Sequence, residues 1–163
     1  MTDPAPETDA ERFLRLAHRE QRGRLTAYLG AAPGVGKTYR MLQDAGRRQA
    51  EGIDVVVGIA ETHGRSDTAQ LLEPLEALPR HVVLHQGHSL EEFDIDAALA
   101  RNPDLILVDE LAHSNAPGCR HPKRWQDVEE LLDAGIDVAT TVNIQHIESL
   151  NDVVAGFTHV RPS

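Results

Sequence analysis

The segment that most constrains the fold is Gly30 to Thr38, in which glycines and a proline precede Gly-Lys-Thr. An apolar run, Leu25 to Leu29, precedes it and predicts a strand. The residues from Tyr39 to Ala45 predict the start of a helix. A strand, a glycine-rich turn, Gly-Lys-Thr and a helix are typical of a phosphate-binding loop.

Each residue type in this loop suits the binding of phosphate. Gly34 and Gly36 allow dihedral angles at which consecutive backbone N–H groups converge on phosphate oxygens. Lys37 is expected to reach the β- and γ-phosphates, and the Thr38 hydroxyl to ligate Mg²⁺. The strict pattern has glycine at position 31, where this chain has alanine, a small substitute. The residues expected to bind ATP are Gly30, Ala31, Ala32, Pro33, Gly34, Val35, Gly36, Lys37, Thr38, Tyr39 and Asn143.

A second signal is the aliphatic segment Asp104 to Glu110, which predicts a buried strand that ends in two acids. Opposite a phosphate-binding loop, Asp109 is expected to hold Mg²⁺ together with Thr38. Glu110 is expected to orient or deprotonate an attacking water. The pair therefore predicts a magnesium site and a candidate catalytic base.

Polar residues at two other strand ends are further candidates. The strand predicted over 137–142 ends at Asn143, and Thr141 or Asn143 is a candidate for contacting the γ-phosphate. The strand predicted over 54–60 is followed by Glu61 and Arg65. Arg65 is a candidate for contacting the nucleotide or a partner, and Glu61 for holding water or a metal; the alternative is that they simply form a polar loop. The carboxyl ends of strands face the ligand in open α/β sheets.

Composition favours a single α/β domain. The chain has 163 residues, of which 40% are hydrophobic and 4% aromatic, so the core must be largely aliphatic. We predict a P-loop NTPase-like fold with a mostly parallel sheet of about five strands and helices on both faces. Residues 1–9 are expected to form a flexible tail, and residues 10–163 one nucleotide-binding domain.

The remaining elements follow from apolar periodicity. A further strand is predicted over 81–85. Helices are predicted over 10–21, 36–50, 66–78, 94–101, 125–132 and 144–154. Pro74 predicts either a kink in the 66–78 helix or its division into two short helices.

Charge and cysteine content limit partners and location. The net charge of −10 argues against binding nucleic acid. Cys119 is the single cysteine, and no apolar run approaches the ~20 residues of a transmembrane helix. We therefore expect a cytoplasmic protein that does not insert into a membrane.

The polar loop from Leu111 to Arg124 is long enough to suggest a function. Within it Arg120, Lys123 and Arg124 form a small basic cluster in an acidic chain. The cluster is expected to contact the nucleotide, a second protomer or an acidic partner, or else to pair with local acids.

Two blocks resemble one family. The first is the phosphate-binding segment. The second runs from Asp109-Glu110-Leu111-Ala112-His113-Ser114-Asn115 through Arg120-His121-Pro122-Lys123-Arg124-Trp125 to Thr140-Thr141-Val142-Asn143. Together they resemble the N-terminal cytoplasmic domain of the KdpD family, bacterial sensor kinases that control potassium uptake.

The resemblance implies an ATP-binding regulatory domain. In the family this domain precedes a universal-stress-protein-like domain, a membrane segment and a histidine-kinase core, and tunes kinase and phosphatase output toward a response regulator. The expected partners are the kinase core or the response regulator, in cis or in trans. The kinase core is not in this sequence, so enzyme activity stays open. The alternatives are a stand-alone ATPase with Glu110 as base and an arginine from a neighbour, Arg120 or Arg124, and a small-molecule kinase.

Overall fold

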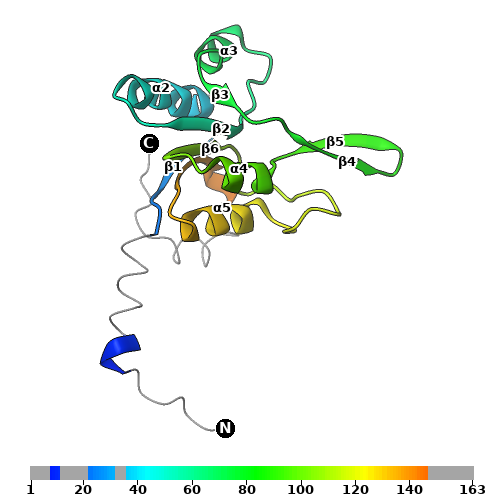
Figure 1. Cartoon of the computed structure of the whole chain (residues 1–163). Helices are drawn as coiled ribbons and strands as arrows, with labels where there is room; N and C mark the ends of the chain where they lie inside the picture. The colour runs from blue at the N-terminus through cyan, green and yellow to red at the C-terminus, as the bar shows by residue number, and fades with distance from the viewer. Residues whose placement is uncertain (1–7, 12–21, 32–35, 147–163) are drawn as a thin grey trace.

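A computed structural model describes residues 8–11, 22–31 and 36–146. Five parallel strands form the central sheet (Figure 1). In spatial order they are β1 (Leu25–Gly30), β7 (Asp137–Asn143), β6 (Leu105–Val108), β2 (Val55–Ile59) and β3 (Glu76–Ala77). The predicted five-stranded parallel sheet is therefore confirmed.

Helices cover both faces of this sheet, as predicted (Figure 1). One face carries α2 (Lys37–Ala50), with α3 (Ser66–Leu72) beside it, and the other carries α4 (Ile95–Arg101) and α5 (Arg124–Asp133). A short 3-10 turn, η1 (Ile144–His146), follows β7.

Strand alternation divides the core into two aliphatic clusters. In β6, Leu105 and Leu107 face α2, whereas Ile106 and Val108 face α4 and α5. All four are buried, which explains why this strand is a continuous aliphatic run. The sheet is thus fixed between two helical layers, and the carboxyl ends of its parallel strands meet at one edge.

The helix predicted over 66–78 is wrong in its second half. Helix α3 ends at Leu72, and residues 76–77 form β3 beside β2. Pro74 has no N–H to continue the helical hydrogen bonds, and it disfavours helical geometry at Glu73. Leu75 is then buried against the α2 side of the sheet. A proline that suggested a kink therefore ends the helix.

The strand predicted over 81–85 is present but lies outside the central sheet. It is β4 (His81–His85), which pairs antiparallel with β5 (His88–Glu92), a strand that was not predicted. Gln86 and Gly87 both have positive φ, at 50° and 80°, as a tight two-residue hairpin turn requires. The hairpin projects away from the sheet (Figure 1).

Several expectations fall partly or wholly outside the described residues. These are the tail over 1–9, most of the helices predicted over 10–21 and 144–154, and loop residues Ala32, Pro33, Gly34 and Val35. The domain limits therefore stay predictions. Within the described part of the chain, no helix combines the length and apolar character that crossing a membrane requires.

Candidate functional site

Six of the predicted candidate residues line one cavity of about 180 Å³ at the carboxyl ends of the strands: Lys37, Thr38, Asp109, Glu110, Thr141 and Asn143. The remaining lining residues are His63, Ala112, His113 and Val142. Lys37 and Asp109 are 72 positions apart in the sequence, yet they line the same cavity.

Lys37 lies at the first turn of α2 and is only 6% exposed. Burial lowers the pKa of its ammonium group, while Asp109 and Glu110 act in the opposite direction. Its side chain crosses Gly30, because a Cβ added at Gly30 would lie 2.7 Å from Cγ and 2.8 Å from Cδ of Lys37. Gly30, rather than the residue at 31, is therefore the position where a side chain would obstruct the lysine.

Thr38 and Asp109 supply the oxygens expected to hold a magnesium ion. The Thr38 hydroxyl donates to Oδ2 of Asp109 at 3.1 Å, and both residues are buried, at 5% and 1% exposed. A hydroxyl and a carboxylate at one spot are donors that suit Mg²⁺, which usually retains several waters as its other ligands. Among the described residues no group of three or more His, Cys, Asp or Glu side chains forms a metal site. The donor set therefore fits a hydrated Mg²⁺ held by two protein groups.

Thr141 organises both acids. Its hydroxyl donates to Oδ1 of Asp109 and accepts the backbone N–H of Glu110 at 3.0 Å. Because the hydroxyl bonds to both acids, Thr141 positions them from the wall of the cavity that it helps to line. The N–H of Glu61 donates to Oδ2 of Asp109 at 3.0 Å, so the carboxylate is held by three neighbours.

Asn143 is the better-placed candidate for a phosphate contact. Strand β7 lies between β1 and β6, and Asn143 is in register with Gly30. This places Asn143 between the strand before the phosphate-binding loop and the strand that ends in Asp109. Its Oδ1 is buried and makes no hydrogen bond to the described residues. A buried polar atom of this kind calls for a partner, and the described residues do not supply one.

Arg124 follows the alternative in which the basic residues of the loop pair with local acids. Its side chain is 3% exposed, and Nη1 donates to the carbonyl oxygen of Asp109 at 2.8 Å. Nη2 lies 3.5 Å from Oε2 of Glu92, a carboxylate that also lies 3.0 Å from Nε2 of His113. Burial lowers the pKa of Arg124, and the nearby carboxylates oppose this effect. Arg124 thus lies inside the protomer, where it holds the backbone of the acid pair.

The other two basic residues of the loop also have local partners. Arg120 pairs with Asp96 and Glu130. The ammonium group of Lys123 donates to the hydroxyl of Ser114 at 2.7 Å, at the start of α5. The expected pairing with local acids is therefore observed for Arg120 and Arg124, whereas Lys123 bonds to a hydroxyl.

The other predicted residues lie around the main cavity or next to it. Gly36 and Tyr39 line an adjacent cavity of about 200 Å³ that also touches Thr38, Glu61 and Arg65. Ala31 is exposed. Glu61 accepts a hydrogen bond from Arg80, and Arg65 pairs with Asp67. The other predicted loop residues, Ala32, Pro33, Gly34 and Val35, lie outside the described residues.

Glu110 has a left-handed backbone, with φ of 58°. For a residue other than glycine this conformation is uncommon and must be held by its surroundings. Here the peptide that joins it to Asp109 is bonded on both sides, at its carbonyl by Arg124 and at its N–H by Thr141. The side chain is exposed and lines the main cavity. The backbone thus directs Glu110 toward the space beside Lys37.

Known proteins were found that match most of the chain. Residues 21–163 match the family described as "KdpD: Osmosensitive K+ channel His kinase sensor domain". The chain is 60% identical over 153 residues to the sensor protein KdpD of Escherichia coli, covering 94% of this chain and 17% of that protein.

Two further relatives agree. The sensor protein KdpD of Mycobacterium tuberculosis is 58% identical over 140 residues, which cover 86% of this chain and 16% of the relative. The putative sensor protein KdpD of Synechocystis is 57% identical over 134 residues, covering 82% and 36%. The chain therefore spans a minor part of these relatives. Given the extent of the family match and these identities, the chain belongs to the KdpD family and corresponds to its N-terminal sensor domain.

Proposed function

We propose that this domain binds ATP with Mg²⁺ and serves as a nucleotide-dependent regulatory unit of a potassium-sensing two-component system. The observation that carries the proposal is the convergence of Lys37, Thr38, Asp109 and Asn143 on one cavity at the end of a parallel sheet. A phosphate chain is the ligand that a lysine, a magnesium-binding pair and a helix N-terminus recognise together.

Each residue has a distinct part in binding. Lys37 supplies positive charge in a partly desolvated place, where it interacts more strongly with phosphate than in water. Asn143 offers a buried polar group that lacks a partner among the described residues. The metal ion, when bound, neutralises phosphate charge, and Thr38 and Asp109 are the residues that would hold it. The loop residues from Ala32 to Val35 supply the backbone N–H groups.

We assign a regulatory role because the relatives are named sensor proteins and are much longer than this domain. In this proposal, nucleotide occupancy changes how the domain meets the histidine-kinase core or the response regulator, and so tunes kinase and phosphatase output. The domain acts on the cytoplasmic side, where ATP is available. The kinase chemistry itself belongs to parts of the family outside this sequence.

The test is titration of ATP with and without Mg²⁺ by calorimetry, with hydrolysis measured in the same samples. Lys37→Ala removes the charged partner of a buried phosphate and is expected to cost roughly 2–5 kcal/mol of binding free energy. Arg40→Ala, on the exposed side of the same helix, is the control. Unchanged ATP affinity in Lys37→Ala would refute the site.

A second candidate function is a working ATPase with Glu110 as the base. It is favoured by one observation, the position of Glu110 on the same cavity as Lys37. The candidate also needs an arginine from a neighbour, and Arg124 is buried in its own protomer. Steady-state turnover that is lost in Glu110→Gln and rises with protein concentration would favour this candidate over a binding switch.

A further inference from the structure

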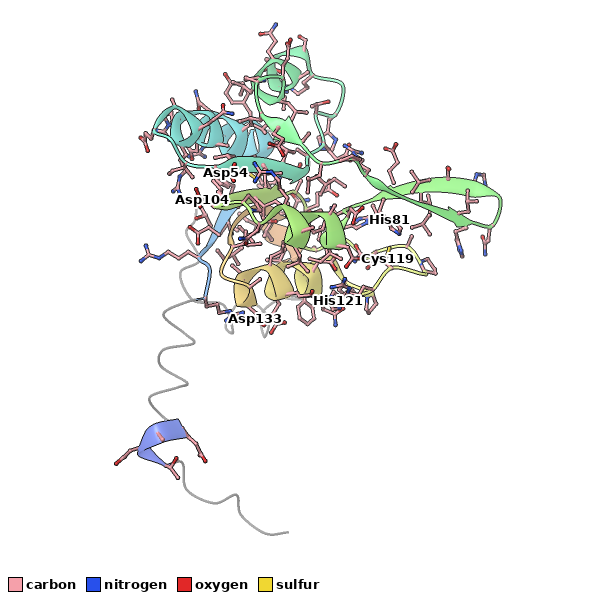
Figure 2. All side chains as sticks on the ribbon, in the orientation of Figure 1. Asp54, His81, Asp104, Cys119, His121 and Asp133 are labelled. Atoms are coloured by element: carbon pink, nitrogen blue, oxygen red, sulfur yellow. The ribbon has the colours of Figure 1, made fainter. Side chains whose placement is uncertain are left out.

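Strand β4 of the hairpin presents two aliphatic side chains that no described element covers, beside Ser89 and Glu91 of β5. Val82 is 55% exposed and Leu84 is 80% exposed, and these alternate residues lie on the same face of β4. The opposite face, which carries Val83, lies near the 111–123 loop, since a Cβ at Gly118 would lie 3.9 Å from Cγ1 of Val83. Figure 2 shows Cys119 on that loop and His81 at the start of β4. One face of the hairpin is therefore backed by the loop, and the other is open.

The base of the hairpin is firmly fixed. Before β4, Arg80 donates to Oε1 of Glu61 and to the carbonyl oxygen of Ala60, both at 3.0 Å. At the end of β5, Glu92 is 5% exposed and lies beside His113 and Arg124. The projecting part thus starts from an anchored base, and its orientation is set by the fold.

The projecting part carries no formally charged side chain. Residues 81–90 contain no Asp, Glu, Lys or Arg, in a protein whose formal net charge is −10. Two copies can therefore approach along this segment without bringing like side-chain charges together. A two-stranded ribbon with an open apolar face also gains stability from additional strands.

The sequence of β4 suits pairing with itself. His81-Val82-Val83-Leu84-His85 is nearly palindromic about Val83. The second edge of β4 is unpaired among the described strands, because its sheet contains only β4 and β5. Two identical antiparallel edges related by a two-fold axis through Val83 would place histidine opposite histidine and aliphatic opposite aliphatic.

We propose that the hairpin is a self-association surface, at which β4 of one copy pairs antiparallel with β4 of a second copy about Val83. The result is a four-stranded sheet in the order β5-β4-β4-β5. Val82 of each copy lies opposite Leu84 of the other, so four aliphatic side chains form one continuous apolar face. The interface is isologous and closes as a dimer.

This interface has a characteristic salt dependence. It contains no ion pair, while each copy carries a formal net charge of −10. Added salt screens the repulsion between the copies and is expected to strengthen association. An interface built on ion pairs would weaken under the same conditions.

The first test is sedimentation of the 163-residue chain over a range of protein and salt concentrations. We expect a monomer–dimer equilibrium that shifts to monomer in Leu84→Lys. This change makes the chain less negative, so a loss of dimer is not due to greater net repulsion. Ile144→Lys is the matched control, because Ile144 is 55% exposed and receives the same charge. A wild-type chain that stays monomeric, or a dimer that survives Leu84→Lys, would overturn the proposal.

The second test reads the register. In a Cys119→Ser background, Val82→Cys and Leu84→Cys proteins are oxidised separately and as a mixture. Opposed residues have Cβ atoms about 4.5–5.5 Å apart, close to disulfide geometry, whereas diagonal neighbours are about 7–8 Å apart. Only the mixture is expected to form covalent dimers. Covalent dimers from either variant alone would contradict this assignment. It would also be contradicted if phospholipid vesicles, rather than a second copy of the chain, prevented oxidation of the hairpin cysteines.

Discussion

Arg124 donates a hydrogen bond to the carbonyl oxygen of Asp109 at 2.8 Å, from a position inside the protein. On the other side of the same peptide, the N–H of Glu110 donates a hydrogen bond to the Thr141 hydroxyl at 3.0 Å. The two bonds fix the peptide that joins the acid pair. The geometry of the proposed magnesium and water positions thus depends on residues from α5 and β7 as well as on Thr38 and Asp109.

Removing Arg124 should destabilise the fold strongly. Arg124→Met leaves the Glu92 carboxylate buried with a weakened set of partners, and breaking a buried pair in this way costs about 3–5 kcal/mol. Glu92→Gln added to Arg124→Met removes the uncompensated charge, so part of the loss should be recovered. Urea unfolding of the two single variants and the double variant measures both effects.

The matched control for Arg124 is Arg120→Met. Arg120 is 39% exposed on its side chain, and exposed ion pairs contribute only about 0–1 kcal/mol. Equal losses in Arg120→Met and Arg124→Met would show that burial of Arg124 is not what matters. An additive double variant of Arg124 and Glu92 would show that the two residues do not act as a pair.

Thr141→Val tests the other side of the same peptide. Valine is close to threonine in shape, but it leaves the Glu110 N–H and Oδ1 of Asp109 without the hydroxyl. A buried group left unpaired costs about 1–3 kcal/mol, so we expect that loss in the free energy of unfolding. If the acids are misplaced, the gain in ATP affinity on adding Mg²⁺ should also shrink. A variant that unfolds more easily but keeps the full Mg²⁺ effect would restrict Thr141 to a structural role.

The sequence predicted the central fold well because its signals are local. The aliphatic runs over β1, β2, β6 and β7 and the glycine-rich turn before α2 each specify an element without knowledge of the others. The convergence of Lys37 with Asp109 also followed, since carboxyl ends of parallel strands meet at one edge.

The sequence did not predict that Arg124 and Thr141 hold the acid pair in place, and the reason is physical. Both act through contacts with Asp109, 15 and 32 positions away in the chain, and no local pattern encodes such contacts. Strand β5 was missed because its exposed residues do not alternate in polarity. The Gln86–Gly87 turn was the available signal, but it is weaker than Asn-Gly.

Gly30→Ala should impair nucleotide binding more than folding. The added Cβ would meet Cγ and Cδ of Lys37 at 2.7 and 2.8 Å, so the lysine side chain must move. We expect weaker ATP binding in calorimetry with little change in the backbone, since alanine suits a strand better than glycine does. Gly46→Ala is the control, because nothing lies within 4 Å of its Cβ and helix stability should rise by about 0.5–1 kcal/mol. Unchanged ATP affinity in Gly30→Ala would refute the steric argument.

Arg101 should contribute to stability only above acidic pH. Its guanidinium donates to both carboxylate oxygens of Asp54, at 2.7 and 2.8 Å, and to Glu76 at 2.8 Å. These hydrogen bonds lower the pKa of Asp54 and Glu76 from their ordinary values of 3.8 and 4.5. Lowered pKa values stabilise the fold above the ordinary values, and the stabilisation is lost as pH falls through the lowered ones.

Thermal unfolding of Arg101→Met across pH tests this contribution. Arg101 joins the end of α4 to Asp54, which Figure 2 shows beside Asp104, and Asp104 accepts the Asp54 N–H at 2.9 Å. The variant should unfold at lower temperature than wild type near neutral pH, and the difference should shrink in acid. A difference that is constant with pH would mean that Arg101 acts through packing rather than through its carboxylate partners.

The pKa of Lys37 gives the ATP site a specific response to alkaline pH. Burial lowers this pKa from 10.5. Asp109 and Glu110 act in the opposite direction, but the effect of burial is larger. Phosphate binds the charged ammonium, so affinity is full below the pKa of the free site and falls as pH rises through it. We expect ATP affinity to decline at a lower pH than an exposed lysine would produce. Lys37→Arg stays charged over this range and should show a flatter profile at lower overall affinity, because its planar head fits the lysine position poorly. Calorimetry from neutral pH upward measures both profiles, and parallel profiles would show that another group controls the response.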